Sequence, residues 1–240
     1  MIFHLIFFDI LLLKTMGNLN IFLENENLVD RALKEVKINY RPYDPGNYLY
    51  REICKEKDIN RKFEDKFIEL IYVTLSAWNM NSRGAKLSDF EDFKDSLKIN
   101  KNQIVTLSKY RMEKIQEIEF GMLTKILEHL FNNLKLVGKN KNNNEKPRLV
   151  TFSKTMHFLL PNLIMPIDRK YTLKFFYNNV SINPKLNLQF QKFLHIFEEC
   201  SNFALKSKLN LKLDDNWNQN VPKIIDNIII GYSKIKSQQK

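Results

Sequence analysis

Apolar residues recur along most of this chain at intervals of three and four, the spacing that places them on one face of an α-helix. The clearest such face lies in the segment 60–78 and comprises Phe63, Phe67, Leu70, Ile71, Thr74, Leu75 and Trp78. Further helices are expected over 25–39, 48–57, 88–97, 102–111, 113–136, 149–160, 169–178, 186–206 and 222–235. No two segments alternate as paired strands would, so the pattern predicts an all-α fold of roughly eight to ten helices.

Two of these helices have a face that can be assigned to the core. In the segment 25–39, the inward residues are Leu28, Ala32 and Val36, and the helix should start after Asn25 or Asn27, which are favoured N-cap residues. In the segment 113–136, the residues expected to face inward are Ile115, Ile118, Met122, Ile126 and Leu130.

Two segments outside the helices indicate how the chain is organised. The opening MIFHLIFFDILLLKT is apolar but too short to span a bilayer, and Met16 follows it. We expect residues 1–15 to be a mis-assigned start or a disordered segment. The second segment, GKNKNNNEK, lies in a polar loop over 138–147. This loop either separates an N-terminal lobe (16–137) from a C-terminal lobe (148–240), or is a surface loop of one compact multi-helix domain.

The charge of the chain favours a polyanionic partner. The formal net charge is +11 and the pI is about 9.4, and lysine accounts for 30 of the 38 basic residues. Such a balance is typical of proteins that associate with nucleic acid. The chain is also rich in Asn, Ile and Phe, which share A/T-rich codons with Lys, so genome composition is a second explanation for the charge.

The two cysteines exclude several classes of site. Cys54 and Cys200 are far apart and stand in no metal-ligand spacing, which rules out a structural zinc site or a four-cysteine iron–sulfur cluster. We expect two buried thiols in a cytoplasmic protein. The sequence has no glycine-rich phosphate loop, no serine triad motif and no paired metal carboxylates, so it implies no cofactor. No segment is long enough to predict a membrane span.

The segment 148–176 carries the candidate chemistry. Lys154 lies opposite the main apolar face of its predicted helix, but its neighbours at i−4 and i+4, Val150 and Phe158, are also apolar. A helix that is apolar nearly all round is usually buried. Burial would lower the pKa of Lys154 and make it a candidate amine nucleophile. The alternative is a lysine whose stem packs against apolar surface while its ammonium pairs with a surface acid.

Asp168 is the second candidate in this segment. It follows Pro166 and precedes the predicted helix 169–178, where Asp is a favoured N-cap residue that accepts the backbone N–H of Lys170 or Tyr171. It is therefore either a helix cap alone or a catalytic carboxylate beside Lys154.

A second polar cluster ends the helix 60–78. Trp78, Asn79, Asn81 and Arg83 bring an aromatic ring, amides and a guanidinium to one helix end, where they could stack on a base and bind a phosphate. The alternative is a core tryptophan followed by a polar helix terminus. Three residues near Lys154 and Asp168 complete the predicted nucleic-acid-binding set: Arg148, His157 and Arg169.

The order of these features resembles a known enzyme family. A helix with a lysine, a proline-containing turn and an aspartate that opens the next helix is similar to the core of the helix-hairpin-helix DNA glycosylases. The resemblance implies that Lys154 attacks the deoxyribose C1′ and that Asp168 supports departure of the base. It also implies two helical lobes and a role in DNA repair.

A second resemblance covers more of the chain. The segments LIYVTLSAWNMNSRGAKL (70–87) and LVTFSKTMHFLLPNLIMPIDRKYTLKFF (149–176) look like those of an uncharacterised group of prokaryotic proteins. That group has a SWGM-R-G-like segment followed by a TK…PxDR-like segment, and it implies no activity. Three hypotheses follow: a DNA N-glycosylase/lyase, a non-catalytic helical module that binds nucleic acid or a protein, and an enzyme of unrelated chemistry that uses Lys154 and Asp168.

Overall fold

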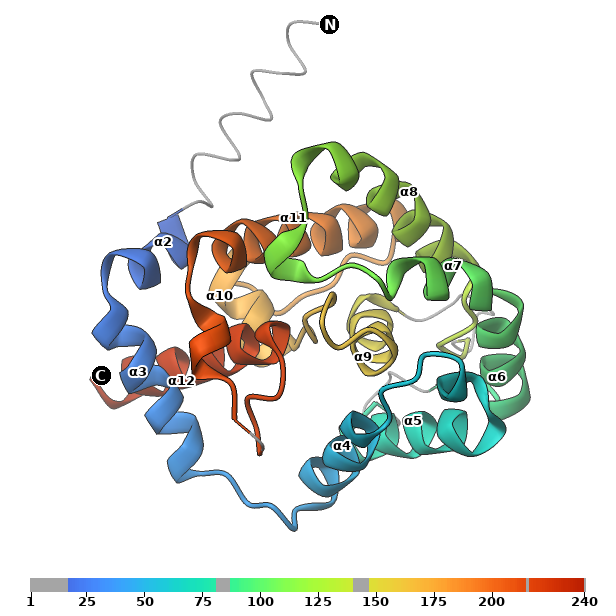
Figure 1. Cartoon of the computed structure of the whole chain (residues 1–240), viewed down its shortest axis with the longest axis horizontal. Coiled ribbons are helices and arrows are strands. Elements are labelled where there is room, and N and C mark those ends of the chain that lie inside the picture. The colour runs from blue at the N-terminus through green and yellow to red at the C-terminus, as the bar shows by residue number, and fades with distance from the viewer. Residues whose placement is uncertain (1–16, 81–86, 140–146, 215, 240) are drawn as a thin grey trace, which may run out of the picture.

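The chain folds as helices arranged around one central helix, α9 (Figure 1). The computed structural model describes residues 17–80, 87–139, 147–214 and 216–239. The α-helices in these residues are α2 (Gly17–Glu24), α3 (Glu26–Ile38), α4 (Pro45–Lys55), α5 (Asp65–Ala77), α6 (Phe90–Ile99), α7 (Lys101–Leu107), α8 (Glu117–Asn133), α9 (Leu149–Leu159), α10 (Lys174–Tyr177), α11 (Leu186–Lys206) and α12 (Val221–Gln238). Short helical turns lie at η1 (Arg61–Phe63), η2 (Met112–Lys114), η3 (Arg169–Leu173) and η4 (Leu209–Lys212).

The predicted all-α fold class is confirmed. The described residues contain eleven α-helices, somewhat more than the sequence suggested, and no strand; Leu87 and Val137 form an isolated β-bridge. One continuous apolar core runs through the helices from α2 to α12. None of the helices in the described ranges is long and apolar enough to cross a membrane.

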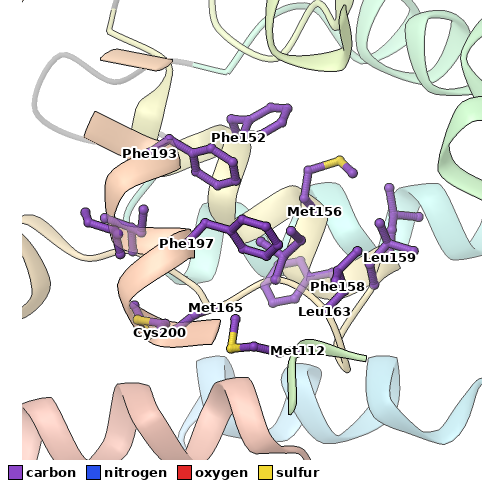
Figure 2. Close-up of a cluster of buried hydrophobic side chains, with 14 of the residues drawn as sticks. Met112, Phe152, Met156, Phe158, Leu159, Leu163, Met165, Phe193, Phe197 and Cys200 are labelled. Atoms are coloured by element: carbon purple, nitrogen blue, oxygen red, sulfur yellow. Dashed lines mark hydrogen bonds between the residues drawn. The ribbon is translucent and has the colours of Figure 1, made fainter. Parts of the chain in front are cut away.

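Helix α9 is buried along its whole length, as its composition predicts. All of its residues from Leu149 to Leu159 are buried, and it packs against α4, α5 and α11. Phe152 of α9 meets Phe193 of α11 edge to face, with ring centroids 5.1 Å apart. Figure 2 shows this contact beside the sulfur-rich part of the core, where the Cys200 thiol lies 3.7 Å from the Met165 sulfur. Both cysteines are free and buried, as expected.

Helices α3 and α12 form a very close helix pair in the described part of the chain. They lie side by side, although they come from opposite ends of the sequence (Figure 1). Gly231 of α12 faces the backbone of Ala32, and a β-carbon at Gly231 would stand 1.9 Å from the Ala32 carbonyl oxygen. Only glycine allows this approach, so the absence of a side chain at this position sets the distance between the helices.

The predicted inner face of α8 is partly wrong. Ile118 is 87% exposed and Met122 is 42% exposed, whereas the buried stripe comprises Leu123, Leu127, Leu130 and Phe131. The helix also starts later than expected, at Glu117, where the Glu119 carboxylate accepts the Gln116 backbone N–H (3.0 Å). Two apolar stripes lie side by side on this helix, and the stripe with Leu123, Leu127 and Phe131 is the one that faces the core.

Candidate functional site

The position of Trp78 follows from the way in which α5 ends. Asn79 adopts a left-handed conformation (φ 61°), and the Met80 N–H bonds to the Leu75 carbonyl (2.9 Å) while the Asn79 N–H bonds to the Ser76 carbonyl (3.0 Å). This is a Schellman termination, which asparagine tolerates well. It confirms the predicted helix end and directs the indole of Trp78 inward, where its Nε1–H donates to the carbonyl of Gly46 on α4 (3.1 Å).

Lys154 lies on α9 over the indole ring of Trp78. Its Nζ is 5.3 Å from the ring centroid, and the residue is only 6% exposed. Among the described residues, the ammonium has neither a hydrogen-bond acceptor nor a carboxylate within salt-bridge distance. Burial lowers the pKa of Lys154, and the nearby Asp168 and Asp226 carboxylates oppose this effect. The predicted desolvated lysine is therefore confirmed, and its amine is easier to deprotonate than that of a surface lysine.

Asp168 caps the helical turn η3, as predicted. Its Oδ1 accepts the backbone N–H groups of Lys170 (2.7 Å) and Tyr171 (3.1 Å), while its own N–H donates to the Thr172 hydroxyl (3.0 Å). Its Oδ2 has no hydrogen-bond donor in the described residues. Since the carboxylate acts electrostatically on Lys154, Asp168 is both a helix cap and a charged neighbour of the buried amine.

A buried ion pair on α12 completes this cluster, and the sequence analysis did not find it. Lys223 Nζ lies 2.6 Å from the Asp226 carboxylate, with both side chains almost fully buried. The same ammonium sits 3.9 Å from the centroid of the Trp217 ring and 5.5 Å from that of Trp78. Burial raises the pKa of Asp226, and Lys223 opposes that effect. Two lysines, two aspartates and two tryptophans thus lie together in one largely buried group, called the Lys154 cluster below.

A hydrogen-bonded chain of polar groups adjoins the Lys154 cluster. His157 Nδ1 lies 2.7 Å from the Ile164 carbonyl, an acceptor only, so Nδ1 carries the proton of the neutral ring. Nε2 then accepts the hydroxyl of Tyr50 (2.9 Å), whose oxygen in turn accepts the Asn220 amide (3.2 Å). Asn220 also caps α12 by accepting the Lys223 backbone N–H (2.9 Å). These bonds fix the start of the helix that carries Lys223 and Asp226.

We expect acid to destabilise the protein through His157. Burial lowers the pKa of His157 from 6.5 to about 3, so between these values the unfolded chain binds a proton that the folded chain excludes. The free energy of unfolding should therefore fall by about 1.4 kcal/mol for each unit of pH below 6, and it should be independent of His157 above pH 7. Urea unfolding of the wild type and of His157→Gln from pH 7 to pH 4 measures this. If the free energy of unfolding fell equally with pH in the two proteins, the lowered pKa of His157 would be contradicted.

The other predicted nucleic-acid-binding residues are not part of the Lys154 cluster. Arg148 is buried and donates to the carbonyls of Phe131 (2.6 Å) and Leu134 (3.2 Å), so it caps the end of α8. Arg169 is exposed, and its Nε donates to the Val180 carbonyl (2.9 Å). His157 is part of the supporting chain. Asn81, Arg83, residues 1–15 and most of the loop 138–147 lie outside the described residues.

The described residues contain no group of three His, Cys, Asp or Glu side chains that could hold a metal ion. Comparison of the chain with protein-family models, with curated proteins and with solved structures finds no match. The functional assignment therefore depends on the residues of the Lys154 cluster.

Proposed function

We propose that this chain is a DNA-associated protein that acts as an N-glycosylase/lyase, with Lys154 as the nucleophile and Asp168 as the supporting carboxylate. The observation that carries the proposal is the buried Lys154 amine, which lies over Trp78 and has no hydrogen-bond or salt-bridge partner in the described residues. A structural lysine at this depth would normally be paired. Nucleophilic catalysis by an amine requires a lowered pKa and a nitrogen that is not engaged in a hydrogen bond or a salt bridge.

The chemistry uses the neutral form of this amine. The Nζ lone pair forms a bond to C1′ of the deoxyribose, and the glycosidic C1′–N bond breaks with its electron pair leaving on the base, which takes up a proton. The new ammonium loses a proton, and the nitrogen lone pair then forms the C1′=N bond while the C1′–O4′ bond breaks and O4′ takes up a proton. The product is a ring-opened, protonated Schiff base between C1′ and Nζ. The Asp168 carboxylate stabilises the positive charge that develops on the sugar.

The surroundings of Lys154 suit a flat substrate group on an anionic chain. Lys223 Nζ lies near the ring centroids of both Trp217 (3.9 Å) and Trp78 (5.5 Å), and aromatic rings of this kind stack on bases. The net charge of +11 favours association with the phosphate backbone. These features support DNA as the partner and the Lys154 cluster as the place where a base is held.

Borohydride trapping on DNA tests the proposal. Hydride reduces the Schiff base to a stable amine, so duplexes with oxidised, alkylated, deaminated or abasic sites should give a covalent protein–DNA adduct. We expect Lys154→Gln to reduce the adduct to background, because the amide cannot form the Schiff base. Asp168→Asn should slow adduct formation but leave stability nearly unchanged, since its amide oxygen still caps η3.

Binding and base release provide the controls. Lys154→Gln should bind DNA like the wild type in anisotropy titrations at low salt, and Lys170→Gln, at an exposed position, should trap as well as the wild type. Base release is measured in parallel, because a glycosylase that activates water leaves no adduct. Absence of both adduct and release over the whole panel would contradict the enzyme. Salt-sensitive binding alone would favour the alternative, a non-catalytic helical module.

A further inference from the structure

A polar cavity is lined in part by Asn220, whose amide donates to the Tyr50 hydroxyl. It has a volume of about 100 Å³ and is bounded by the end of α4, the turn after α9 and the residues before α12. Its lining includes Glu56, Lys57, Lys62, Asn162 and Asn220. Since one liquid water occupies about 30 Å³, this space is large enough for a group of several heavy atoms.

Lys62 gives this cavity a buried positive charge. The residue is 4% exposed, and its Nζ donates to the carbonyls of Phe158 (3.1 Å) and Leu159 (3.0 Å) at the end of α9. An ammonium has three N–H donors, so one remains for a group in the cavity. Burial, together with the neighbouring Lys57, lowers the pKa of Lys62 to about 8, which still leaves the side chain mostly charged at pH 7.

No acidic side chain of the described residues forms a salt bridge with this charge, although the Glu56 carboxylate acts on it electrostatically and opposes the lowering of the Lys62 pKa. Neither Lys57 nor Lys62 has a carboxylate within salt-bridge distance in the part of the chain that the structure describes. Glu56 lines the cavity, but its carboxylate accepts the Asp58 backbone N–H (2.8 Å) and pairs with Arg61 (3.7 Å). A buried cation without a counterion is costly, and an anion in the cavity would remove that cost.

The remaining wall supplies neutral hydrogen-bond donors. The side-chain amide of Asn162 makes no hydrogen bond with any described residue, while its backbone carbonyl is fixed by the Met112 N–H (2.8 Å). The Asn220 amide uses one of its two hydrogens on Tyr50. The buried ammonium of Lys62, together with the exposed Lys57 and the amide residues Asn162 and Asn220 in the lining, suits a tetrahedral oxyanion, which accepts several hydrogen bonds at once.

We propose that this cavity binds a phosphate group, held by Lys62 and Lys57 and oriented by Asn162. This site is separate from the Lys154 cluster, and its proposal does not depend on the function proposed for that cluster. The phosphate belongs either to a free small molecule or to a nucleic-acid backbone, and the two sources share the same chemistry.

Titration with inorganic phosphate, measured by calorimetry and by thermal melting at a constant ionic strength set with chloride, tests the site at pH 7. We expect saturable binding and a rise in Tm for the wild type, because a ligand that binds only the folded state stabilises it. Lys57→Gln should raise the Kd roughly tenfold through loss of one charge-assisted bond. Lys62→Met should abolish binding.

Three further variants make the result decisive. Lys55→Gln is the matched control, because Lys55 is exposed, pairs with Glu52 (2.6 Å) and does not line the cavity, and it should bind like the wild type. Asn162→Leu should weaken binding, and with Lys57→Gln it decides the question if Lys62→Met fails to fold. Lys154→Gln should bind phosphate normally, so failure of the glycosylase proposal leaves this result intact.

The source of the phosphate follows from competition with a DNA oligonucleotide. Displacement of bound phosphate by the oligonucleotide identifies the nucleic-acid backbone as the occupant, and retention of phosphate identifies a free phosphorylated molecule. Two outcomes would overturn the proposal: no phosphate-specific binding above the chloride control, or equal binding by the wild type, Lys57→Gln and Asn162→Leu.

Discussion

Gly231→Ala is expected to lower the free energy of unfolding by at least about 3 kcal/mol, the upper end of the range for overpacked sites. The added methyl group would meet the backbone of Ala32 at 1.9 Å from its carbonyl oxygen, and neither helix can relieve this contact by rotating a side chain. Helices α3 and α12 must therefore separate along their length. Urea unfolding monitored by circular dichroism measures the loss.

Gly121→Ala is the matched control for this substitution. Gly121 is also a helical glycine, on α8, but a β-carbon there would have nothing within 4 Å. Alanine should stabilise this position by about 0.5–1 kcal/mol because of its higher helix propensity. The two variants thus differ in the sign of their effect. A loss below about 1 kcal/mol for Gly231→Ala would show that the helix pair is more adaptable than its geometry indicates.

Asp226→Asn should have a comparable effect, a loss of about 3–5 kcal/mol, because it leaves the Lys223 ammonium buried without its counterion. Lys223 is 2% exposed and has no other carboxylate within salt-bridge distance in the described residues. Its remaining close neighbour is the Trp217 ring, at 3.9 Å, which compensates only part of a full charge. Chemical denaturation at pH 7 gives the value.

Two comparisons test the cause. The double variant Lys223→Met, Asp226→Leu removes both charges and should recover most of the lost stability, since well-packed apolar residues often replace a buried pair without cost. Asp65→Asn breaks the exposed pair with Lys98 and should leave the stability nearly unchanged. If the double variant were as unstable as Asp226→Asn, shape rather than unpaired charge would be responsible.

The sequence was sufficient wherever the determining pattern was local. The burial of α9 and the lowered pKa of Lys154 follow from apolar residues on every side of one short helix. The cap at Asp168 and the left-handed Asn79 follow from residue preferences at helix ends. Each of these features depends on residues within about four positions of one another, and a linear sequence contains that information.

The rest depends on contacts between distant segments. The Lys223–Asp226 pair is indicated locally, because a lysine and an acid stand at i and i+3 in the largely apolar segment VPKIIDNIII. Nothing in the sequence indicates, however, that α12 meets Trp78. Helix α2 was not predicted because it is short and is fixed by tertiary contacts. Phe22 on α2 packs against the rings of Phe175, Phe203 and Tyr232.

The pairing of α3 with α12 also has a consequence during protein synthesis. Helix α3 leaves the ribosome first, and roughly 180 residues must then be added before α12 begins at Val221. At about 5–20 residues per second, the apolar face of α3, formed by Val29, Ala32 and Val36, stays uncovered for roughly 10 to 40 seconds. The nascent chain should therefore engage a chaperone at this helix and release it only when α12 arrives to displace it.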